Sequence, residues 1–363
     1  MSKALRVVIA GGGTGGHLYP GIAVARELLA RRPDSAVTFA GTQTGLEFRV
    51  VPREGFELDT IRSGGLKGKS LADRARGASL IPLGMRDAWH IVSRRRPDLV
   101  IGVGGYSSGP VVLTAALRGV PTMLLEQNAV PGLTNRLLAR VVTAAAVTYE
   151  STRSFFGSKA FVSGNPVRAE FVDRQETADG AREPGVHLLI FGGSQGAHAI
   201  NAAMVAAAPT LAGLGVPLRI THQAGERDVE MVQQGYAAAG LTATVEAFLY
   251  DMPVRLGQAD LVVCRAGATT LAELMAAGKP SILIPLPTAT DDHQRKNAEA
   301  LASTGAADVM LQHDAMGPAL ASRIASLVND AEARTRMSAA ARALARLDAA
   351  RVIVDRALAL ARR

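Results

Sequence analysis

Short apolar runs that lead into glycines recur along the first part of the chain. Leu5–Ala10 (LRVVIA) runs directly into three glycines, and Asp98–Val103 (DLVIGV) runs into two. Uninterrupted apolar runs of this length are typical of strands in a parallel sheet that is covered on both faces. The segments between them, such as Tyr19–Arg31, have helical periodicity. This alternation predicts an α/β domain with a doubly wound parallel sheet.

The same pattern restarts in the second half of the chain. A polar, turn-rich stretch, Thr177–Gly185 (TADGAREPG), follows a region in which the periodicity weakens. Beyond it, apolar runs such as His187–Phe191 (HLLIF) and Leu261–Cys264 (LVVC) are separated by helical stretches. A chain of 363 residues is long enough for two domains of middling size. We therefore predict a first domain over residues 1–165 and a second over residues 166–344.

Two nine-residue stretches, one in each half, resemble each other. Ile9–His17 reads IAGGGTGGH, and Ile190–His198 reads IFGGSQGAH. In both, an apolar strand ends in a glycine loop, and a histidine stands at the expected start of a helix. Loops at such positions present backbone N–H groups to anions, and open α/β sheets bind their ligands there. The repeat predicts two Rossmann-like domains whose parallel sheets face a central cleft.

The first glycine loop also has the spacing of the dinucleotide fingerprint, Gly11-x-Gly13-x-x-Gly16. An NAD-binding domain needs a carboxylate at the end of its second strand to bind the adenosine ribose. The expected second strand, Ala36–Ala40, continues into Gly41 and Thr42 and has no carboxylate there. The sequence therefore speaks against an NAD-dependent oxidoreductase.

The stretch Cys264–Glu273 (CRAGATTLAE) is the best candidate for a nucleotide site in the second half. It leaves a strand at Arg265, Thr269 and Thr270 can cap the helix that follows, and the N–H groups of residues 268–270 suit a pyrophosphate. Glu273 has two oxygens that could accept from both hydroxyls of a ribose. Alternatively, Glu273 forms a capping box with its own helix.

Charge is unevenly distributed. The formal net charge is +8, and the segment from Lys67 to Arg96 alone has eight basic residues against two acidic ones. Apolar residues, among them Leu80, Ile81 and Trp89, are interleaved with the basic ones. This composition suits attachment to an anionic lipid surface; the alternative is an ordinary amphipathic helix with a solvated face. Aromatic residues make up only 4% of the chain and do not alternate with the basic ones, so we expect no nucleic acid as a partner.

Several features bear on the compartment. The single cysteine, Cys264, excludes an internal disulfide framework and is consistent with a reducing environment. The N-terminal stretch leads into a strand and a glycine loop and lacks the features of a signal peptide. Apolar runs stay well short of the roughly 18 residues that predict a transmembrane helix. We expect a cytoplasmic protein that attaches to a membrane surface without spanning it.

Taken together, the motifs resemble those of the MurG family, the bacterial transferases that use UDP-N-acetylglucosamine and a lipid-linked muramyl-pentapeptide. The matching stretches are GGTGGH (Gly12–His17), GGYSSGP (Gly104–Pro110), EQN (Glu126–Asn128), GNPVR (Gly164–Arg168), GGSQGA (Gly192–Ala197), CRAGATTLAE and the Gln294–Asn297 region. They span almost the whole chain in the expected order. The resemblance implies the GT-B glycosyltransferase fold, with a C-terminal helix at about residues 345–363 that packs back on the first domain.

The resemblance also implies a reaction. N-acetylglucosamine would pass from UDP-N-acetylglucosamine to the 4-hydroxyl of undecaprenyl-pyrophosphoryl-N-acetylmuramyl-pentapeptide, which turns lipid I into lipid II in peptidoglycan synthesis. The transfer would invert the anomeric carbon at the cytoplasmic face of the bacterial inner membrane, where the enzyme is peripheral. No cofactor is expected. The alternative is another UDP-sugar enzyme of the same fold, such as a UDP-N-acetylglucosamine 2-epimerase or a soluble glycosyltransferase.

Site residues carry over position by position. The residues implied to contact the donor are Thr14, Gly15, Gly16, Asn128, Arg168, Ser194, Leu249 through its backbone, Ala268, Thr269, Thr270, Leu271, Ala272, Glu273 and Gln294. Tyr106 and Ser107 are expected beside the acceptor, and Leu80, Ile81 and Trp89 at the membrane.

His17 has the residue type and the position of a general base, and Glu126 is the alternative base or its orienting partner. Asp291, Asp292 and His293 look like a metal-ligand cluster, but consecutive residues rarely converge on one ion. We therefore expect no metal.

Overall fold

The computed structural model describes residues 4–64, 80–172, 185–193, 196–289 and 292–361. The chain divides into two compact units, which are described separately. Unit 1 comprises Met1–Arg168 and Arg346–Arg363, and unit 2 comprises Ala169–Ala345.

Unit 1 is built on a seven-stranded sheet in the order β3-β2-β1-β4-β5-β6-β7, and every neighbouring pair is parallel. Its strands are β1 (Arg6–Gly11), β2 (Ala36–Gly41), β3 (Glu57–Thr60), β4 (Leu99–Gly104), β5 (Thr122–Glu126), β6 (Ala144–Val147) and β7 (Ala160–Val162). Its helices are α1 (Gly15–Arg31), α2 (Glu47–Arg53), α4 (Ile81–Arg95), α5 (Ser108–Leu117), α6 (Leu133–Leu138) and α15 (Ala349–Ala361), with the 3-10 turns η1 (Glu150–Phe155) and η2 (Gly157–Lys159).

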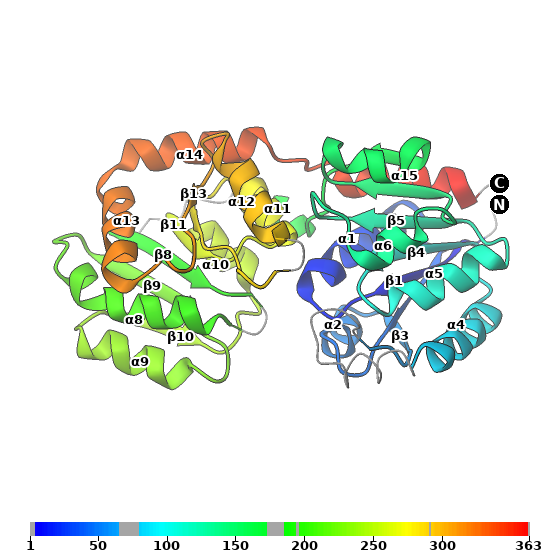
Figure 1. Cartoon of the computed structure of the whole chain (residues 1–363), viewed down its shortest axis with the longest axis horizontal. Helices are drawn as coiled ribbons and strands as arrows, with labels where there is room; N and C mark the ends of the chain where they lie inside the picture. The colour runs from blue at the N-terminus through cyan, green and yellow to red at the C-terminus, as the bar shows by residue number, and fades with distance from the viewer. Residues whose placement is uncertain (1–3, 65–79, 173–184, 194–195, 290–291, 362–363) are drawn as a thin grey trace. The chain divides into compact units, whose positions relative to one another are not determined.

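Helices cover both faces of this sheet (Figure 1). Successive side chains of a strand point to opposite faces. Val7 and Ile9 of β1 therefore join the core beneath α1 and α15, whereas Val8 and Ala10 join the core beneath α4 and α5. Helix α15 returns from the far end of the sequence to pack against α1, and Arg31 reaches its Asp355 at 2.7 Å.

Unit 2 contains a six-stranded parallel sheet in the order β10-β9-β8-β11-β12-β13. Its strands are β8 (Val186–Phe191), β9 (Leu218–Gln223), β10 (Ala243–Glu246), β11 (Leu261–Cys264), β12 (Ser281–Leu283) and β13 (Asp308–Val309). Its helices are α7 (Ala169–Val172), α8 (His198–Ala212), α9 (Val229–Ala238), α10 (Met252–Gln258), α11 (Ala268–Ala277), α12 (His293–Ala302), α13 (Gly317–Asn329) and α14 (Ala331–Ala343). Apolar residues of α8, α9 and α13 fill the core on one face.

Strand order explains where the glycine loops lie. In unit 1 the chain moves outward from β1 to β2 and β3 and then returns to place β4 on the other side of β1. Unit 2 repeats this with β8, β9, β10 and then β11. The loops after β1 and β4, and those after β8 and β11, therefore flank the two points where the strand order reverses. Such switch points are where open α/β sheets bind ligands. The predicted pair of Rossmann-like parallel sheets is confirmed.

Among the described residues, no helix combines the length and the apolar character needed to cross a bilayer.

Candidate functional site

The first glycine loop of unit 1 lies tightly between two neighbours. Gly11 and Gly12 have φ values of 140° and 148°, which side chains rarely allow. A Cβ at Gly11 would collide with the carbonyl oxygen of Gly104, and one at Gly12 would lie 2.5 Å from the carboxyl group of Glu47. Glycine is therefore required here so that the loop can fit between β4 and α2.

His17 is the third residue of α1 and lies half-buried beside the second glycine loop. Its ring covers Gly104, where a Cβ would be 2.6 Å from Cδ2 and 2.9 Å from Nε2. On the other side of the ring, Nδ1 lies 3.3 Å from the hydroxyl of Thr14. A base acting through Nε2 needs its hydrogen on Nδ1, and this contact gives that hydrogen an acceptor. Thr14, Gly15 and Gly16 lead directly into this residue.

Glu47 is a residue of this site that the sequence did not reveal. It opens α2 and is completely buried, with 0% exposure. Its carboxylate accepts hydrogen bonds from Gly13 N at 2.6 Å, Thr42 N at 2.8 Å and Thr42 Oγ1 at 2.8 Å. Glycines surround it, since a Cβ at Gly41 would also press on its side chain. Two glycines shortly before this acidic residue, Gly41 and Gly45, were the only signal in the sequence.

The second glycine loop presents a tyrosine. Tyr106 is 45% exposed, whereas Ser107 is 2% exposed. Tyr106 is therefore the side chain of this pair that can meet an acceptor, and direct contact through the side chain of Ser107 would require the loop to move.

Glu126, at the end of β5, is buried at 2% exposure. Its oxygens accept from Asn128 N and Gly132 N at 3.0 Å each and from Asn135 Nδ2 at 2.9 Å. Burial raises the pKa of Glu126, and these hydrogen bonds act in the opposite direction. Because its oxygens organise the loop that carries Asn128, the geometry favours an orienting role over that of the base.

Arg168, the last residue of the first segment of unit 1, stacks its guanidinium over the ring of Tyr19 at 4.3 Å from the ring centroid. Such stacking fixes the direction of a long side chain. Tyr19 belongs to α1, so the arginine expected to contact the donor is oriented by the helix that carries His17.

In unit 2, helix α11 begins one residue after Gly267, which has the extended conformation of an N-cap. The expected capping by Thr269 and Thr270 is wrong, because both lie inside the helix. The capping-box alternative for Glu273 fails for the same reason, since Glu273 is the sixth helical residue and such a box needs the third. Glu273 is 8% exposed. The N-terminus of α11, with Ala268, Leu271 and Ala272 in its first turns, remains available for an anion.

Two glutamines tie the loops of unit 2 together. Gln294, near the start of α12, accepts at Oε1 from Ala266 N at 3.3 Å and from Leu286 N at 3.0 Å, so its Nε2 is the group suited to a sugar oxygen. Gln223, at the end of β9, donates to the carbonyl of Gly193 at 2.7 Å and accepts from Leu249 N at 3.1 Å. Sequence reasoning missed Gln223. Ser194 lies outside the described residues.

No three His, Cys, Asp or Glu side chains come together as metal ligands within the part of the chain that is described. Asp291 lies outside that part, whereas Asp292 is the N-cap of α12 and His293 is its first residue. The expected absence of a metal stays a prediction.

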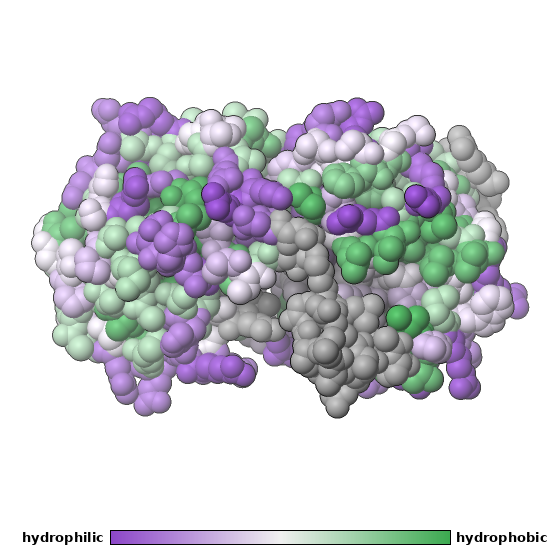
Figure 2. Space-filling view, in the orientation of Figure 1, coloured by the Kyte–Doolittle hydropathy of each residue, from purple (hydrophilic) through white to green (hydrophobic). Residues whose placement is uncertain are grey.

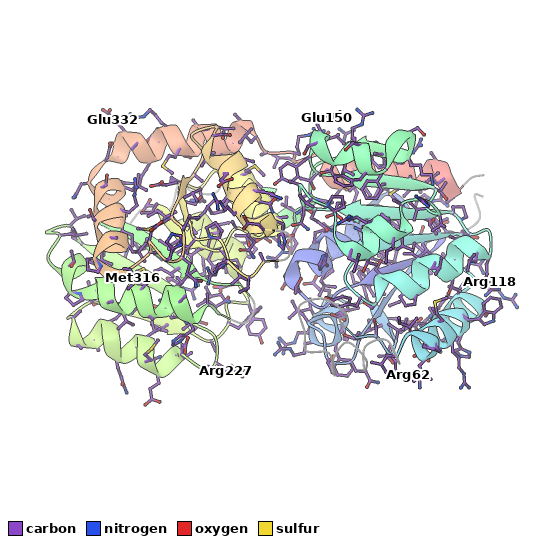
Figure 3. The ribbon with its side chains drawn as sticks, in the orientation of Figure 1. Arg62, Arg118, Glu150, Arg227, Met316 and Glu332 are labelled. Atoms are coloured by element: carbon purple, nitrogen blue, oxygen red, sulfur yellow. The ribbon has the colours of Figure 1, made fainter. Side chains whose placement is uncertain are left out.

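The basic and apolar segment is only partly described, since Lys67, Lys69, Arg74 and Arg76 lie outside the described residues. In α4, Trp89 is 58% and Ile81 47% exposed, and Leu80 just before the helix is half-buried. The guanidinium of Arg118, labelled in Figure 3, lies 4.8 Å from the centre of the Trp89 ring.

The charge of this segment is lower than its sequence indicates. Arg94 and Arg95 both bind Asp59 of β3, and Arg95 also binds Glu57 at 2.7 Å. The two acidic residues come from outside the segment, so residue counting within it missed them. Figure 2 shows apolar side chains gathered over α5 and α6, where Leu117 and Leu137 are 72% and 73% exposed.

Comparisons with known proteins cover nearly the whole chain. Residues 7–147 match the glycosyltransferase family 28 N-terminal domain, and residues 187–353 match the C-terminal domain of that family. A UDP-N-acetylglucosamine–N-acetylmuramyl-(pentapeptide) pyrophosphoryl-undecaprenol N-acetylglucosamine transferase of Anaeromyxobacter sp. (strain K) is 48% identical and covers 99% of this chain and 94% of its own length. A transferase of the same name from Geobacter sulfurreducens is 46% identical, over 99% of this chain and all of its own length.

Among solved structures, the crystal structure of Acinetobacter baumannii MurG is 34% identical and matches with a TM-score of 0.75 over 98% of this chain and 99% of that chain. The resemblance drawn from the motifs, the GT-B fold and the expectation of a glycosyltransferase are confirmed. The chain belongs to glycosyltransferase family 28 and, within it, to the UDP-N-acetylglucosamine–N-acetylmuramyl-(pentapeptide) pyrophosphoryl-undecaprenol N-acetylglucosamine transferases.

Proposed function

We propose that this protein transfers N-acetylglucosamine from UDP-N-acetylglucosamine to the 4-hydroxyl of undecaprenyl-pyrophosphoryl-N-acetylmuramyl-pentapeptide, the step from lipid I to lipid II. The observation that carries the proposal is the placement of His17. It stands at the sheet's switch point in unit 1, with one ring nitrogen beside Thr14 Oγ1. Relatives that are 46% and 48% identical to this chain are named for this reaction.

In the proposed step, Nε2 of His17 removes the proton of the acceptor hydroxyl, and the oxygen attacks the anomeric carbon of the donor sugar. The new bond forms as the bond to UDP breaks, so the anomeric configuration inverts. The imidazole keeps the proton, and UDP leaves with the electron pair. Glu126 acts on this machinery through the Asn128 loop and does not take the proton.

The departing diphosphate gains negative charge. The N-terminus of α11 offers backbone N–H groups and the positive end of its dipole, and Arg168 offers a guanidinium held in place by Tyr19. Glu273, largely buried, is suited to bind the ribose hydroxyls because few waters compete for its oxygens there. Leu249 would contact the uracil through its backbone, and Gln294 the sugar through Nε2.

The test is transfer of labelled N-acetylglucosamine from the UDP donor to a short-chain lipid-linked muramyl-pentapeptide, with UDP binding measured on the same preparation. Transfer supports the proposal. UDP binding with no transfer to this acceptor would contradict it and would favour another UDP-sugar enzyme of the fold, such as a UDP-N-acetylglucosamine 2-epimerase.

We also propose that unit 1 attaches peripherally to the cytoplasmic face of the inner membrane. The support is the exposure of Ile81 and Trp89 on α4, next to Arg118. Basic residues near an anionic surface contribute about 1 kcal/mol each.

Vesicles that contain anionic phospholipid should bind the wild-type protein in a flotation assay. The triple variant in which Leu80, Ile81 and Trp89 are replaced by serine should no longer float with these vesicles. The matched control is Met316→Ser, which removes a 65% exposed apolar side chain from unit 2 (Figure 3) and should leave binding unchanged. Equal binding of the triple variant would refute this surface.

A further inference from the structure

A fully buried carboxylate supports the loop that carries His17. Glu47 takes all of its described hydrogen bonds from backbone or hydroxyl donors, and none of these donors is a cation. A carboxylate is costly to bury, and three short hydrogen bonds are the compensation that makes it tolerable. The chain also keeps glycine at positions 12, 41 and 45, where a Cβ would strike this side chain. An apolar side chain would fill this space without needing the three hydrogen bonds. The negative charge therefore has a function of its own.

The carboxylate of Glu47 acts on the N–H of Gly13. In loops with this glycine spacing, backbone N–H groups at the start of the helix commonly face a phosphate. Here the Gly13 N–H points inward to Glu47 at 2.6 Å. The negative charge beneath the loop also opposes the approach of a phosphate. The N–H of Gly13 therefore holds the loop against Glu47 and is turned away from any anion that binds beside it.

The support is transmitted to His17 over a short path. Gly12 lies against Glu47 on one side, and on the other side its N–H lies 3.4 Å from the carbonyl of Gly104. A Cβ at Gly105 would lie 2.6 Å from the carbonyl oxygen of Gly12, and a Cβ at Gly104 equally close to the His17 ring. The segment from Gly12 to His17 is therefore fixed between Glu47 and the second glycine loop.

We propose that Glu47 is a positioning residue for the transfer reaction: its buried carboxylate sets the conformation of Gly12–Gly13 and thereby the placement of the His17 imidazole against Gly104. The proposal rests on the proposed function of His17 as the base. Glu47 contacts the loop and Thr42, so it acts through the loop and not on the substrate.

Glu47→Gln tests this with little change in volume. An amide can accept at its oxygen, but its NH2 group would face N–H or O–H donors, so the loop must rearrange. A misplacement of about 1 Å at a catalytic group can lower turnover about 100-fold. We expect kcat to fall by that order, while the Kd for UDP changes less than about twofold, because the contacts of UDP itself are proposed for unit 2 and Arg168. Thr42→Val removes one of the three donors and should lower kcat by about tenfold or less.

The matched control is Glu150→Gln, which neutralises a 73% exposed carboxylate in the same unit (Figure 3) and should keep wild-type kcat. Circular dichroism and thermal melting verify that each variant is folded. A folded Glu47→Gln protein with wild-type kcat would overturn the proposal, as would a loss of UDP binding that parallels the loss of turnover. If the wild-type protein itself transfers no sugar, the proposed function fails, and the two failures are thus distinguishable.

A double-mutant cycle separates positioning of His17 from general weakening of unit 1. If Glu47 acts through the imidazole, Glu47→Gln should lower kcat little further in a His17→Ala background. Multiplicative losses in the double variant would show that Glu47 acts elsewhere and would overturn the proposal. Where turnover of His17→Ala falls below detection, the split between kcat and the Kd for UDP in the single variant decides.

Discussion

The glycine loops after β1 and β8 share a sequence pattern, but opposite kinds of hydrogen bond support them. Beneath the loop after β1, the carboxylate of Glu47 accepts from Gly13 N. Beneath the loop after β8, the amide of Gln223 donates to the carbonyl of Gly193. The first support therefore uses a backbone N–H, and the second uses a backbone carbonyl. The loop after β1 therefore cannot offer the N–H of Gly13 to a phosphate, whereas the hydrogen bond from Gln223 to the loop after β8 engages no backbone N–H of that loop.

The histidines that end the two repeats differ in the same sense. His17 lies in the first turn of α1 with its ring against Gly104 and Thr14 Oγ1. His198 is the first residue of α8, and its mostly exposed ring pairs with Asp228 at 3.0 Å. In the proposed function, the first repeat carries the base and the second repeat begins the unit that binds the nucleotide. Sequence similarity between the loops does not imply similar chemistry.

The largest effect should come from exchanging these histidines for alanine. A general base contributes about 100- to 10,000-fold to turnover, so we expect His17→Ala to lower kcat about 1,000-fold with UDP binding intact. His198→Ala removes an exposed ring and its hydrogen bond to Asp228 and should change kcat less than about threefold. Radiolabel transfer and calorimetric UDP titration on both variants provide the comparison. Equal losses would show that the two loops are functionally equivalent.

A smaller effect should follow from Gln223→Leu, which keeps the volume but removes the hydrogen bonds to Gly193 and Leu249. Leaving those buried backbone groups unpaired should raise the KM for UDP-N-acetylglucosamine by about tenfold, with kcat affected much less. Gln234→Leu, at an exposed position of α9, is the control and should behave as wild type. The contrast with Glu47→Gln is informative, because support of the loop after β1 should govern kcat and support of the loop after β8 should govern KM. A fall in kcat with unchanged KM for Gln223→Leu would contradict this division.

Sequence patterns identified the central strands because these are buried on both faces and must be apolar throughout. They did not identify β3, β7 and β13, which are short or polar and pair at or near a sheet edge, where one side needs no apolar run. The strand β6 (AAAV) was also missed, because alanine favours helices and only pairing with β5 and β7 makes this segment a strand.

The same limit applies to the site. Glycine spacing located the loops, and residues within them, such as Thr14 and His17, follow directly. The residues that support the loops do not, because packing brings them from elsewhere in the sequence: Glu47 lies 34 residues from Gly13, and Gln223 lies 30 from Gly193. Helix α11 shows that the same limit applies to residues close together in the sequence. The threonines predicted a capping role, but Gly267 is the N-cap and both threonines lie inside the helix.

The smallest expected effect concerns stability and distinguishes the units by pH. In β9 of unit 2, buried His222 forms hydrogen bonds with the Tyr236 hydroxyl at 2.8 Å and with Asn201 Oδ1 at 2.9 Å. Burial lowers the pKa of His222 to about 3. Below about pH 6.5, the pKa of an unperturbed histidine, His222 binds a proton in the unfolded chain but stays neutral in the folded unit. The contribution of His222 to the stability of unit 2 is therefore complete above about pH 6.5 and decreases as the pH falls toward 3. The free energy of unfolding can change by at most about 1.4 kcal/mol per pH unit for one group.

The thermal midpoint of the unfolding transition assigned to unit 2 should therefore fall between pH 7 and pH 5, and it should fall further in the wild type than in His222→Gln. The variant is already destabilised at pH 7, but it has no imidazole at this position to take up a proton. Parallel pH profiles for the two proteins would show that His222 does not cause this pH dependence.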